Sequence, residues 1–166
     1  TLSPLRYSHA PKHEYFAVRN SVGVFDTSPL YKYAVTGPDA ERLLAGALVR
    51  DVKQCRPGQA QYTAWCDDRG FVMHDGVVFR HSTDEFLLTA ARPALSWFQE
   101  LGAGLRVELE DVTDAYGMLA VQGPNARSIV SSTLHIDLPK RMHVAHHKIG
   151  RRAALVCGTG YTGEDG

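Results

Sequence analysis

The sequence carries one short pattern twice. Residues 35–40 read Val-Thr-Gly-Pro-Asp-Ala, and residues 121–126 read Val-Gln-Gly-Pro-Asn-Ala. Each copy follows an apolar run, and each is followed by paired aliphatic residues at 43–44 and 129–130. Proline suits the first turn of a helix, so each copy predicts a strand, a tight turn and a helix. The repeat indicates two similar α+β lobes; independent use of one good turn is the alternative.

The stretch between the two copies is rich in strands. Residues 60–66 and 71–80 flank Asp67-Asp68-Arg69-Gly70, which is a strong hairpin turn. Further strands are expected at residues 33–35, 85–90, 105–112, 118–122, 144–149 and 153–157, and helices at 12–21, 38–48 and 92–101. Strands and helices follow no regular βαβ rhythm. The sequence therefore predicts an α+β fold with mainly antiparallel sheets and packed helices.

The last residues form a distinctive polar loop. Three glycines alternate with polar residues in 160–166, directly after the apolar run 153–157. Such glycines let the backbone approach a ligand closely or adopt a positive φ. A natural domain rarely ends there, because the edge of the preceding strand would remain uncovered. We expect a fragment, with an incomplete first lobe of residues 1–50 and 113–166 and a second lobe of residues 51–112.

Composition limits the partners of the chain. Eighteen basic and eighteen acidic residues cancel, so no overall field attracts nucleic acid or an anionic membrane. The sequence has no apolar run of membrane-spanning length, and we expect no signal peptide. Cys55, Cys66 and Cys157 are far apart, which favours free thiols in a reducing compartment. We therefore predict a cytoplasmic protein.

Histidines near the end of the chain are the best candidates for metal ligands. His146 and His147 are adjacent on an expected strand and therefore point to opposite faces, while His143 lies at the start of the same region. Cysteines and carboxylates do not cluster beside them, as a metal site would require. We predict that the chain has no metal site.

Asp75 is the first candidate for a functional residue. If Val72 faces the core, strand alternation places His74 and Gly76 on that side and Asp75 opposite, beside Met73 and Val77. Apolar neighbours would deprive the carboxylate of solvent, and such a group can accept a proton or hold a ligand nitrogen. A solvated carboxylate on an exposed strand face is the alternative, and residue type alone favours it.

Tyr62 is the second candidate. It shares a strand face with Ala64, and its ring can line a flat heterocycle while its hydroxyl forms a hydrogen bond. A tyrosine in the hydrophobic core is the alternative, and the sequence pattern alone favours it.

Several segments, in order, resemble the folate-dependent aminomethyltransferase family of the glycine cleavage system. The matching segments are residues 17–28, 35–40, 51–52, 61–63, 70–75, 122–124 and 160–166. The resemblance begins near residue 12 and continues to the end of the chain. Whole members of the family are longer, so the resemblance implies that a C-terminal half with a barrel domain is absent here.

The resemblance implies a tetrahydrofolate site and a role for particular residues. Asp75 falls on an aspartate that meets the pterin side of the cofactor, where a carboxylate orients the reacting nitrogen and offsets its developing positive charge. It would therefore be the catalytic residue as well as a cofactor contact. Leu30 and Tyr62 match residues that line the cofactor pocket. Val77 and Tyr161 are the further cofactor-binding residues that we predict.

The chain departs from the family pattern in four places. His74 replaces an aspartate, Ala91 replaces an asparagine, and Gly158 replaces an arginine. Residues 28–31 read Ser-Pro-Leu-Tyr where the family has Ser-His-Met-Gly. The departures indicate a relative of the T-protein of glycine cleavage rather than that protein itself, and they leave the carbon donor undetermined.

The resemblance implies transfer of an aminomethyl or methyl group to tetrahydrofolate. Its donor would be a small molecule, or a carrier protein whose lipoyl arm holds the aminomethyl group. One alternative is a folate-binding scaffold or assembly protein on the same fold, although such relatives carry a cysteine where this chain has Thr159-Gly160-Tyr161. Another alternative is the folate-binding portion of a dimethylglycine or sarcosine dehydrogenase-like enzyme. A third alternative is that the fragment alone is inactive, because ligands of the family also contact residues beyond position 166.

Overall fold

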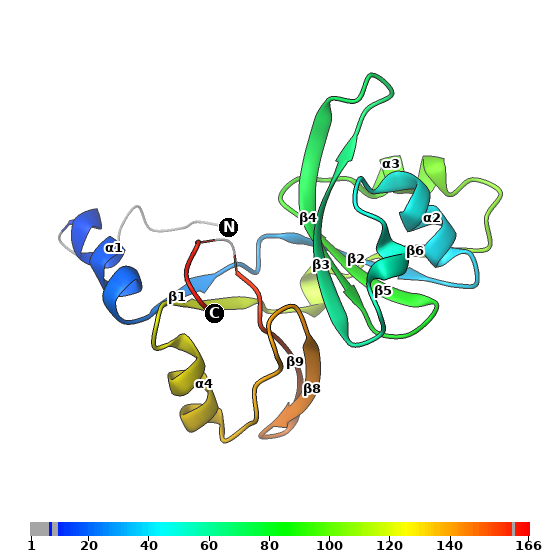
Figure 1. Ribbon diagram of the computed structural model, residues 1–166. Helices are drawn as coiled ribbons and strands as arrows, with labels where there is room; N and C mark the ends of the chain where they lie inside the picture. Colours follow the sequence, from blue (N-terminus) through cyan, green and yellow to red (C-terminus); the bar gives the residue numbers. More distant parts are fainter. Residues whose placement is uncertain (1–6, 8–9, 161) are drawn as a thin grey trace. The chain divides into compact units, whose positions relative to one another are not determined.

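The chain forms two compact units in a computed structural model (Figure 1). The structure describes residue 7, residues 10–160 and residues 162–166. The first unit comprises Thr1–Pro29 and Gly117–Gly166, and the second comprises Leu30–Tyr116. We expected the second lobe to begin at residue 51. Residues 30–50 belong to the second unit because they supply a strand to its sheet and a helix to its core.

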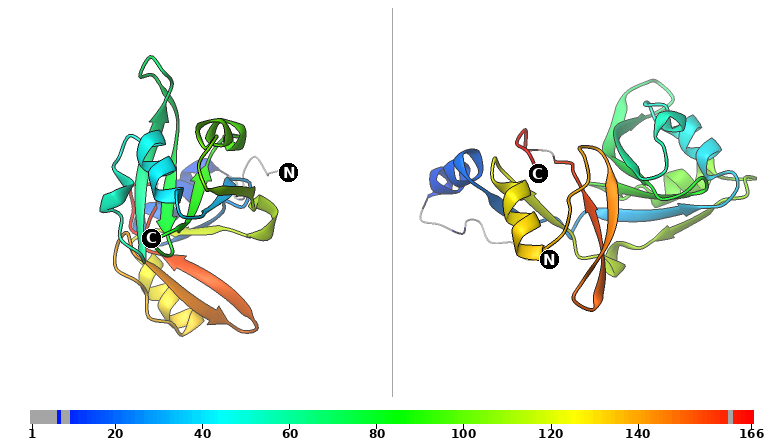
Figure 2. Two further views of the ribbon diagram at one scale, coloured as in Figure 1. Left: turned by 90° about the vertical axis from the view of Figure 1, so that its right-hand side faces the viewer. Right: turned by 60° about the horizontal axis from the view of Figure 1, so that its bottom comes forward.

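An antiparallel five-stranded sheet forms the second unit, in the order β3-β4-β5-β2-β6. The strands are β2 (Tyr31–Thr36), β3 (Gln59–Cys66), β4 (Val72–Arg80), β5 (Glu85–Ala90) and β6 (Glu108–Asp111). The helices are α2 (Ala40–Ala47) and α3 (Leu95–Leu101), with short 3-10 turns η1 (Val52–Gln54) and η2 (Thr113–Ala115). The β3–β4 hairpin extends beyond the rest of this unit (Figure 1, Figure 2). The predicted hairpin and the predicted α+β class are thus confirmed.

The core of the second unit lies on one face of its sheet. Alternate residues of the strands pack there against α2 and α3, and the largest of these side chains is Trp65. Leu43 and Leu44, the paired aliphatic residues after the first Gly-Pro turn, are buried residues of α2. The hydroxyl of Tyr33 accepts a hydrogen bond from the backbone of Ala94 at 2.9 Å, so the phenol is buried with its polar atom paired.

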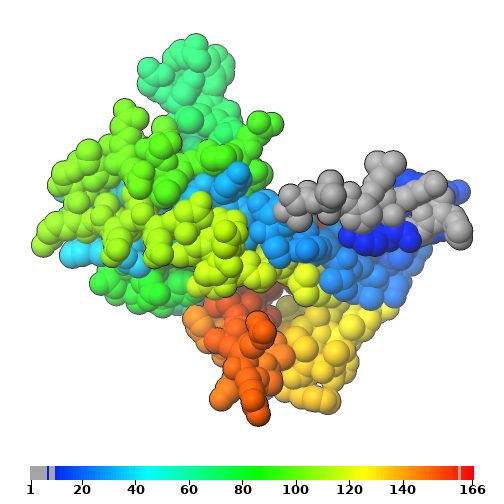
Figure 3. Space-filling model, turned by 180° about the vertical axis from the view of Figure 1, so that it is seen from behind, coloured from blue at the N-terminus to red at the C-terminus, as the bar shows by residue number. Residues whose placement is uncertain are grey.

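The first unit contains two separate antiparallel pairs of strands. β1 (Gly23–Asp26) pairs with β7 (Leu119–Gln122), and β8 (Val144–Ile149) pairs with β9 (Arg152–Cys157). Its helices are α1 (Pro11–Asn20) and α4 (Ala126–Leu134). Figure 3 shows the β8–β9 hairpin, in orange, beside α4, in yellow. None of the helices described in either unit is both long and apolar enough to span a membrane.

The two Gly-Pro turns have the same backbone geometry. Gly37 has φ +118° and Gly123 has φ +132°, a region that side chains rarely occupy. A Cβ on Gly37 would lie 2.6 Å from the carbonyl oxygen of Arg106, and one on Gly123 would lie 2.4 Å from that of Ser21. Glycine is therefore required twice for one reason: the turn lies against the backbone of a neighbouring segment.

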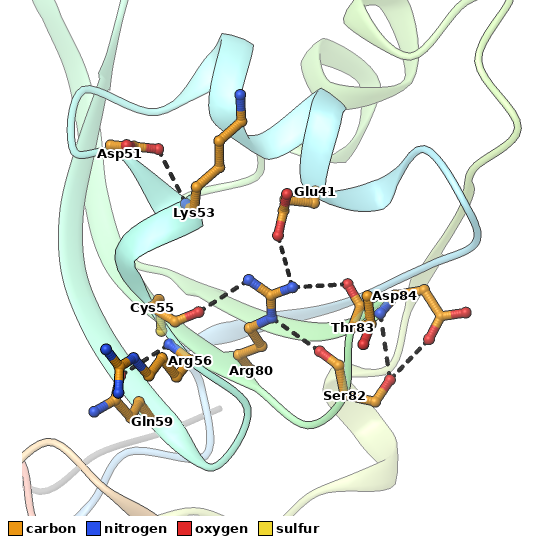
Figure 4. A network of polar contacts seen from close by, with 10 residues as sticks. All are labelled: Glu41, Asp51, Lys53, Cys55, Arg56, Gln59, Arg80, Ser82, Thr83 and Asp84. Atoms are coloured by element: carbon orange, nitrogen blue, oxygen red, sulfur yellow. Dashed lines mark hydrogen bonds and ion pairs between the residues drawn. The ribbon is translucent and has the colours of Figure 1, made fainter.

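A buried arginine joins four segments of the second unit (Figure 4). The Arg80 side chain donates hydrogen bonds of 3.0 Å to the carbonyl oxygens of Cys55, Ser82 and Thr83. It also forms an ion pair of 2.6 Å with Glu41 of α2. Only 5% of Arg80 is exposed, so the planar guanidinium is desolvated and depends on these partners.

We expect Arg80→Lys to lower the free energy of unfolding by about 3 kcal/mol, because an ammonium cannot reach all four partners and leaves buried carbonyls unpaired. Urea denaturation of the whole chain measures the loss. Arg106→Lys is the matched control, since that side chain is 76% exposed and its ion pair lies at the surface. Equal losses in the two variants would contradict the structural role of the Arg80 network.

Candidate functional site

The β3–β4 hairpin brings Tyr62 and Asp75 together. The register pairs Tyr62 with Val77 and Ala64 with Asp75, so the two polar side chains are diagonal neighbours on one face of the sheet. The Tyr62 hydroxyl donates a hydrogen bond of 2.5 Å to Oδ2 of Asp75. Both side chains are exposed, Tyr62 to 54%. Tyr62 is therefore not a core tyrosine, and its ring is available to a ligand.

Strand alternation holds at His74 but fails before it. The His74 ring packs edge-on against Trp65 at 6.2 Å between ring centroids, so His74 faces the core as expected. A β-bulge lies at Met73, just before His74 in the chain, because Trp65 pairs with His74 whereas Cys66 pairs with Val72. Val72 is consequently 67% exposed and Met73 packs against the core. The condition that Val72 faces the core therefore does not hold, and the placing of Met73 beside Asp75 is wrong for this reason.

The bulge changes the expected surroundings of Asp75. Its side chain is exposed rather than enclosed by an apolar wall, and the phenol of Tyr62 donates a hydrogen bond to its carboxylate. The hydrogen bond to Asp75, and then the negative charge of Asp75, raise the pKa of Tyr62 above its ordinary value of 10.0. Oδ1 of the carboxylate can still accept a hydrogen bond from a ligand N–H group. The pair can thus orient a nitrogen donor beside an aromatic ring.

Two residues that the sequence reasoning missed fix the backbone around Asp75. Regular pairing of β4 with β5 covers the segment from Val78 to Arg80. Beyond it, the Thr89 hydroxyl accepts from the Val77 N–H at 3.1 Å and donates to the Val77 carbonyl at 3.3 Å. A Cβ on Gly76 would lie 1.8 Å from the Thr89 carbonyl oxygen. Glycine inside a strand was the available signal, since it marks close approach of another backbone.

Of the remaining predicted site residues, only Val77 lies next to Tyr62 and Asp75 among the residues that the structure describes. Val77 is half-buried and directly opposite Tyr62, so it contributes an apolar surface next to the pair. Leu30 is half-buried just before β2, two strands from β4 in the same sheet, and its carbonyl accepts from Lys32 Nζ at 2.8 Å. Tyr161 lies outside the described residues. The structure therefore brings together Tyr62, Asp75 and Val77.

The glycines of the last loop are explained by contacts within the first unit. Gln122 is 1% exposed, and its Oε1 accepts from the Thr162 hydroxyl at 2.9 Å. A Cβ on Gly160 or on Gly166 would lie 2.0 Å from the Gln122 side-chain amide. Gly163 has φ +81° and serves the loop turn. The close approach that these glycines permit is thus to a buried glutamine.

In the part of the chain that the structure describes, neither a metal-binding cluster nor either of two cavities in the first unit extends the Tyr62–Asp75 site. Among residues 7, 10–160 and 162–166, no group of three or more histidine, cysteine or acidic side chains is placed to hold a metal ion. Cavities of about 450 and about 230 Å³ are both in the first unit, and neither is lined by Tyr62 or Asp75. The pair is an exposed surface site on the sheet of the second unit.

Comparison with known proteins identifies the family. Residues 2–166 match the model for the GCVT N-terminal domain, so the chain belongs to the glycine cleavage T-protein family. The crystal structure of glycine cleavage system aminomethyltransferase T from Bartonella henselae has the same fold, with a TM-score of 0.84 at 24% identity. That match covers 98% of this chain and 45% of the Bartonella chain. The predicted family resemblance and its restriction to the N-terminal half are confirmed.

Curated relatives agree with this assignment. The chain is 38% identical to an aminomethyltransferase of Streptomyces coelicolor, over 98% of this chain and 45% of that protein. It is 37% identical to an aminomethyltransferase of Thermus thermophilus, over 99% of this chain and 49% of that protein. The chain thus spans about half the length of the curated relatives that it matches.

We expect Asp75→Asn to lower the pKa of Tyr62 toward its ordinary value, because the acceptor loses its negative charge. Ultraviolet titration measures the ionisation of the tyrosine side chains, and the difference between the parent and Tyr62→Phe proteins gives the part that belongs to Tyr62. Since the folded pKa is raised, the pair stabilises the fold below about pH 10 and this contribution is lost as the pH rises through the folded pKa. Asp68→Asn, on the exposed hairpin turn, is the control; an equal shift there would contradict the contact.

We expect Gly76→Ala to lower the free energy of unfolding by about 1–3 kcal/mol, because the methyl group forces β4 away from Thr89. It should also return the pKa of Tyr62 toward its ordinary value if β4 carries Asp75 away. Gly46→Ala in α2 is the control: no atom lies within 4 Å of the new Cβ, and alanine favours a helix by about 0.5–1 kcal/mol. Chemical denaturation distinguishes them, and equal stability changes would refute the close contact.

Proposed function

We propose that this chain is the folate-binding part of a tetrahydrofolate-dependent one-carbon transferase of the glycine cleavage T-protein type. The observation that carries the proposal is the hydrogen-bonded pair of Tyr62 and Asp75 on the β3–β4 hairpin. The pair occurs in a chain that matches the family domain over nearly its whole length. Its chemistry suits a cofactor that presents a flat ring with N–H donors.

Asp75 would orient the cofactor and assist its reaction electrostatically. Tetrahydrofolate, when bound, supplies the amine nitrogen that takes up the one-carbon group. The Tyr62 phenol fixes one carboxylate oxygen of Asp75, which leaves Oδ1 for a ligand N–H group. A fixed carboxylate favours positive charge that develops on that nitrogen. A ligand stacked over the exposed pair would exclude water from it and so strengthen this attraction.

The apolar residues would hold the ring system. Val77 is next to Tyr62 in the register and offers a surface for a flat heterocycle, and Leu30 lies further across the same sheet. Tyr161 completes the proposed cofactor contacts. His74 packs on Trp65 on the opposite side of the strand. Its exchange for the family aspartate therefore leaves the charge on the Asp75 side of β4 unchanged.

The carbon donor and the partner follow from the proposed class of reaction. Transfer to tetrahydrofolate breaks a bond between the one-carbon group and a nitrogen or sulfur atom of the donor. The donor would be a methylated or aminomethylated small molecule, or the lipoyl arm of a carrier protein. Because the chain spans about half of its relatives, residues of a C-terminal half would complete the active enzyme.

One observation favours a second candidate function, a folate-binding scaffold that does not catalyse transfer. Tyr62 and Asp75 are exposed and line neither described cavity, so this chain alone offers the reacting groups little protection from water. Binding of tetrahydrofolate without transfer from any aminomethyl donor would support the scaffold function.

We expect Asp75→Asn to weaken tetrahydrofolate binding by roughly 10- to 100-fold, because one hydrogen bond to a charged group is lost. Tyr62→Phe should weaken binding less, since the carboxylate remains but is no longer fixed. Isothermal titration calorimetry under anaerobic conditions measures both. Asp68→Asn is the control, since its exposed side chain lies on the hairpin turn away from the pair. Equal affinity in the parent and Asp75→Asn proteins would remove Asp75 from the proposed role.

A further inference from the structure

We propose that the β8–β9 hairpin of the first unit is a docking surface for an acidic peptide segment of a partner protein. The inference rests on the charge and exposure of side chains in the hairpin and at its base. It goes beyond the proposed function and does not depend on the folate site.

Positive charge is concentrated in and around this hairpin. Residues 138–163 contain no aspartate or glutamate, although the chain as a whole has as many acidic as basic residues. The same stretch contains five cations, which are Lys140, Arg141, Lys148, Arg151 and Arg152. The hairpin therefore has a local positive field that the neutral chain as a whole does not have.

The five cations are open to a partner. All of them are exposed, and the hairpin forms part of the molecular surface beside α4 in Figure 3. The ion pairs between described residues use other cations, namely Arg19, Arg69, Arg80 and Arg106. An acidic partner would thus not have to break an ion pair of this kind before it binds the hairpin.

Strand geometry places three of the cations together at the hairpin tip. Ile149 pairs with Arg152, so Gly150 and Arg151 form the turn between the strands. Lys148 precedes this turn on the exposed face of β8 and lies opposite Ala153, whose small side chain is also exposed. A carboxylate can therefore approach the Lys148 ammonium without first displacing a large neighbouring side chain.

The base of the hairpin holds the other two cations. A Cβ on Gly158 would lie 2.9 Å from the Lys140 carbonyl oxygen and 3.3 Å from the Cα of Arg141. The Met142 N–H donates to the Gly158 carbonyl at 2.8 Å, and Met142 has φ +56°, which side chains rarely adopt. The tight turn and the missing side chain thus fix Lys140 and Arg141 beside the end of β9.

The two groups of cations fit an extended peptide. β8 (Val144–Ile149) lies between them, and a strand of this length spans roughly 20 Å. Alternate side chains of an extended peptide recur every 7 Å or so on one face. A segment of about eight residues with carboxylates at alternate positions would therefore reach from the base of the hairpin to its tip.

Composition favours a peptide over a nucleic acid or a membrane. Residues 137–160 contain no phenylalanine, tyrosine or tryptophan, so the hairpin has no ring on which bases could stack and no aromatic membrane anchor. The isoelectric point of the chain is about 7.0, whereas nucleic-acid-binding domains are typically strongly basic. Screening limits the attraction to about 8 Å at physiological salt, so the partner must bring its carboxylates to the hairpin itself.

Titration of the whole chain with synthetic peptides tests the proposal. The probe is a peptide of about eight residues in which glutamate alternates with threonine, and the control peptide has glutamine in place of each glutamate. We expect the glutamate peptide to bind at least roughly 10-fold more tightly at low salt, because each exposed ion pair adds a modest attraction. Nuclear magnetic resonance should show shifted amide signals within residues 140–153, and added salt should weaken binding.

Charge reversal separates the hairpin from the net charge of the chain. One variant reverses the tip, with Lys148→Glu, Arg151→Glu and Arg152→Glu, and should bind the two peptides equally. The matched control reverses three exposed cations of the second unit, with Arg42→Glu, Lys53→Glu and Arg92→Glu. It has the same net charge as the tip variant and should keep the preference for the glutamate peptide. Circular dichroism checks that both variants fold.

Three results would overturn the proposal. The first is equal affinity of the parent chain for the two peptides, and the second is an equal loss of preference in the two triple variants. The third comes from a short DNA duplex and from vesicles that contain phosphatidylserine, measured at physiological salt. If either binds the hairpin more tightly than the glutamate peptide does, the surface serves a nucleic acid or a membrane instead.

Discussion

Close contact between a glycine and a neighbouring carbonyl is the constraint on which both units depend. At Gly37 and Gly123 the contact fixes the turn that leads from a central strand into a helix. At Gly76 the contact lets β5 approach the strand that carries Asp75. A side chain at any of these positions would separate two backbone segments, so the loss would spread from one turn to the sheet pairing around it.

The geometry of the candidate site follows from sheet register. Tyr62 and Asp75 meet because β3 and β4 pair with Val77 opposite Tyr62. The bulge at Met73 shifts the register only beyond this pair, toward the hairpin turn. The Thr89 hydroxyl continues the contact between β4 and β5 beyond their regular ladder. The site therefore relies on backbone arrangement more than on burial.

Local patterns in the sequence predicted much of this fold, and long-range contacts account for what they missed. The β3–β4 hairpin, the positions of the Gly-Pro turns and the helices that follow them were predictable, because their signals lie in residues adjacent in sequence. The bulge at Met73, the Thr89 hydrogen bonds and the packing of Gly160 on Gln122 depend on residues distant in sequence. Strand alternation gave the face on which Tyr62 and Asp75 each lie. Their contact could not be predicted, because it depends on the register between β3 and β4.

The corner around Arg80 also provides a chemical reporter. Cys55, whose carbonyl accepts from Arg80, is 3% exposed, and burial raises the pKa of its thiol. A protonated, enclosed sulfur reacts slowly with alkylating reagents, since the thiolate is the nucleophile. Labelling of Cys55 therefore requires this corner to open. Its rate, set against the rates of the half-buried Cys66 and Cys157, would give the frequency of that local opening in the native protein.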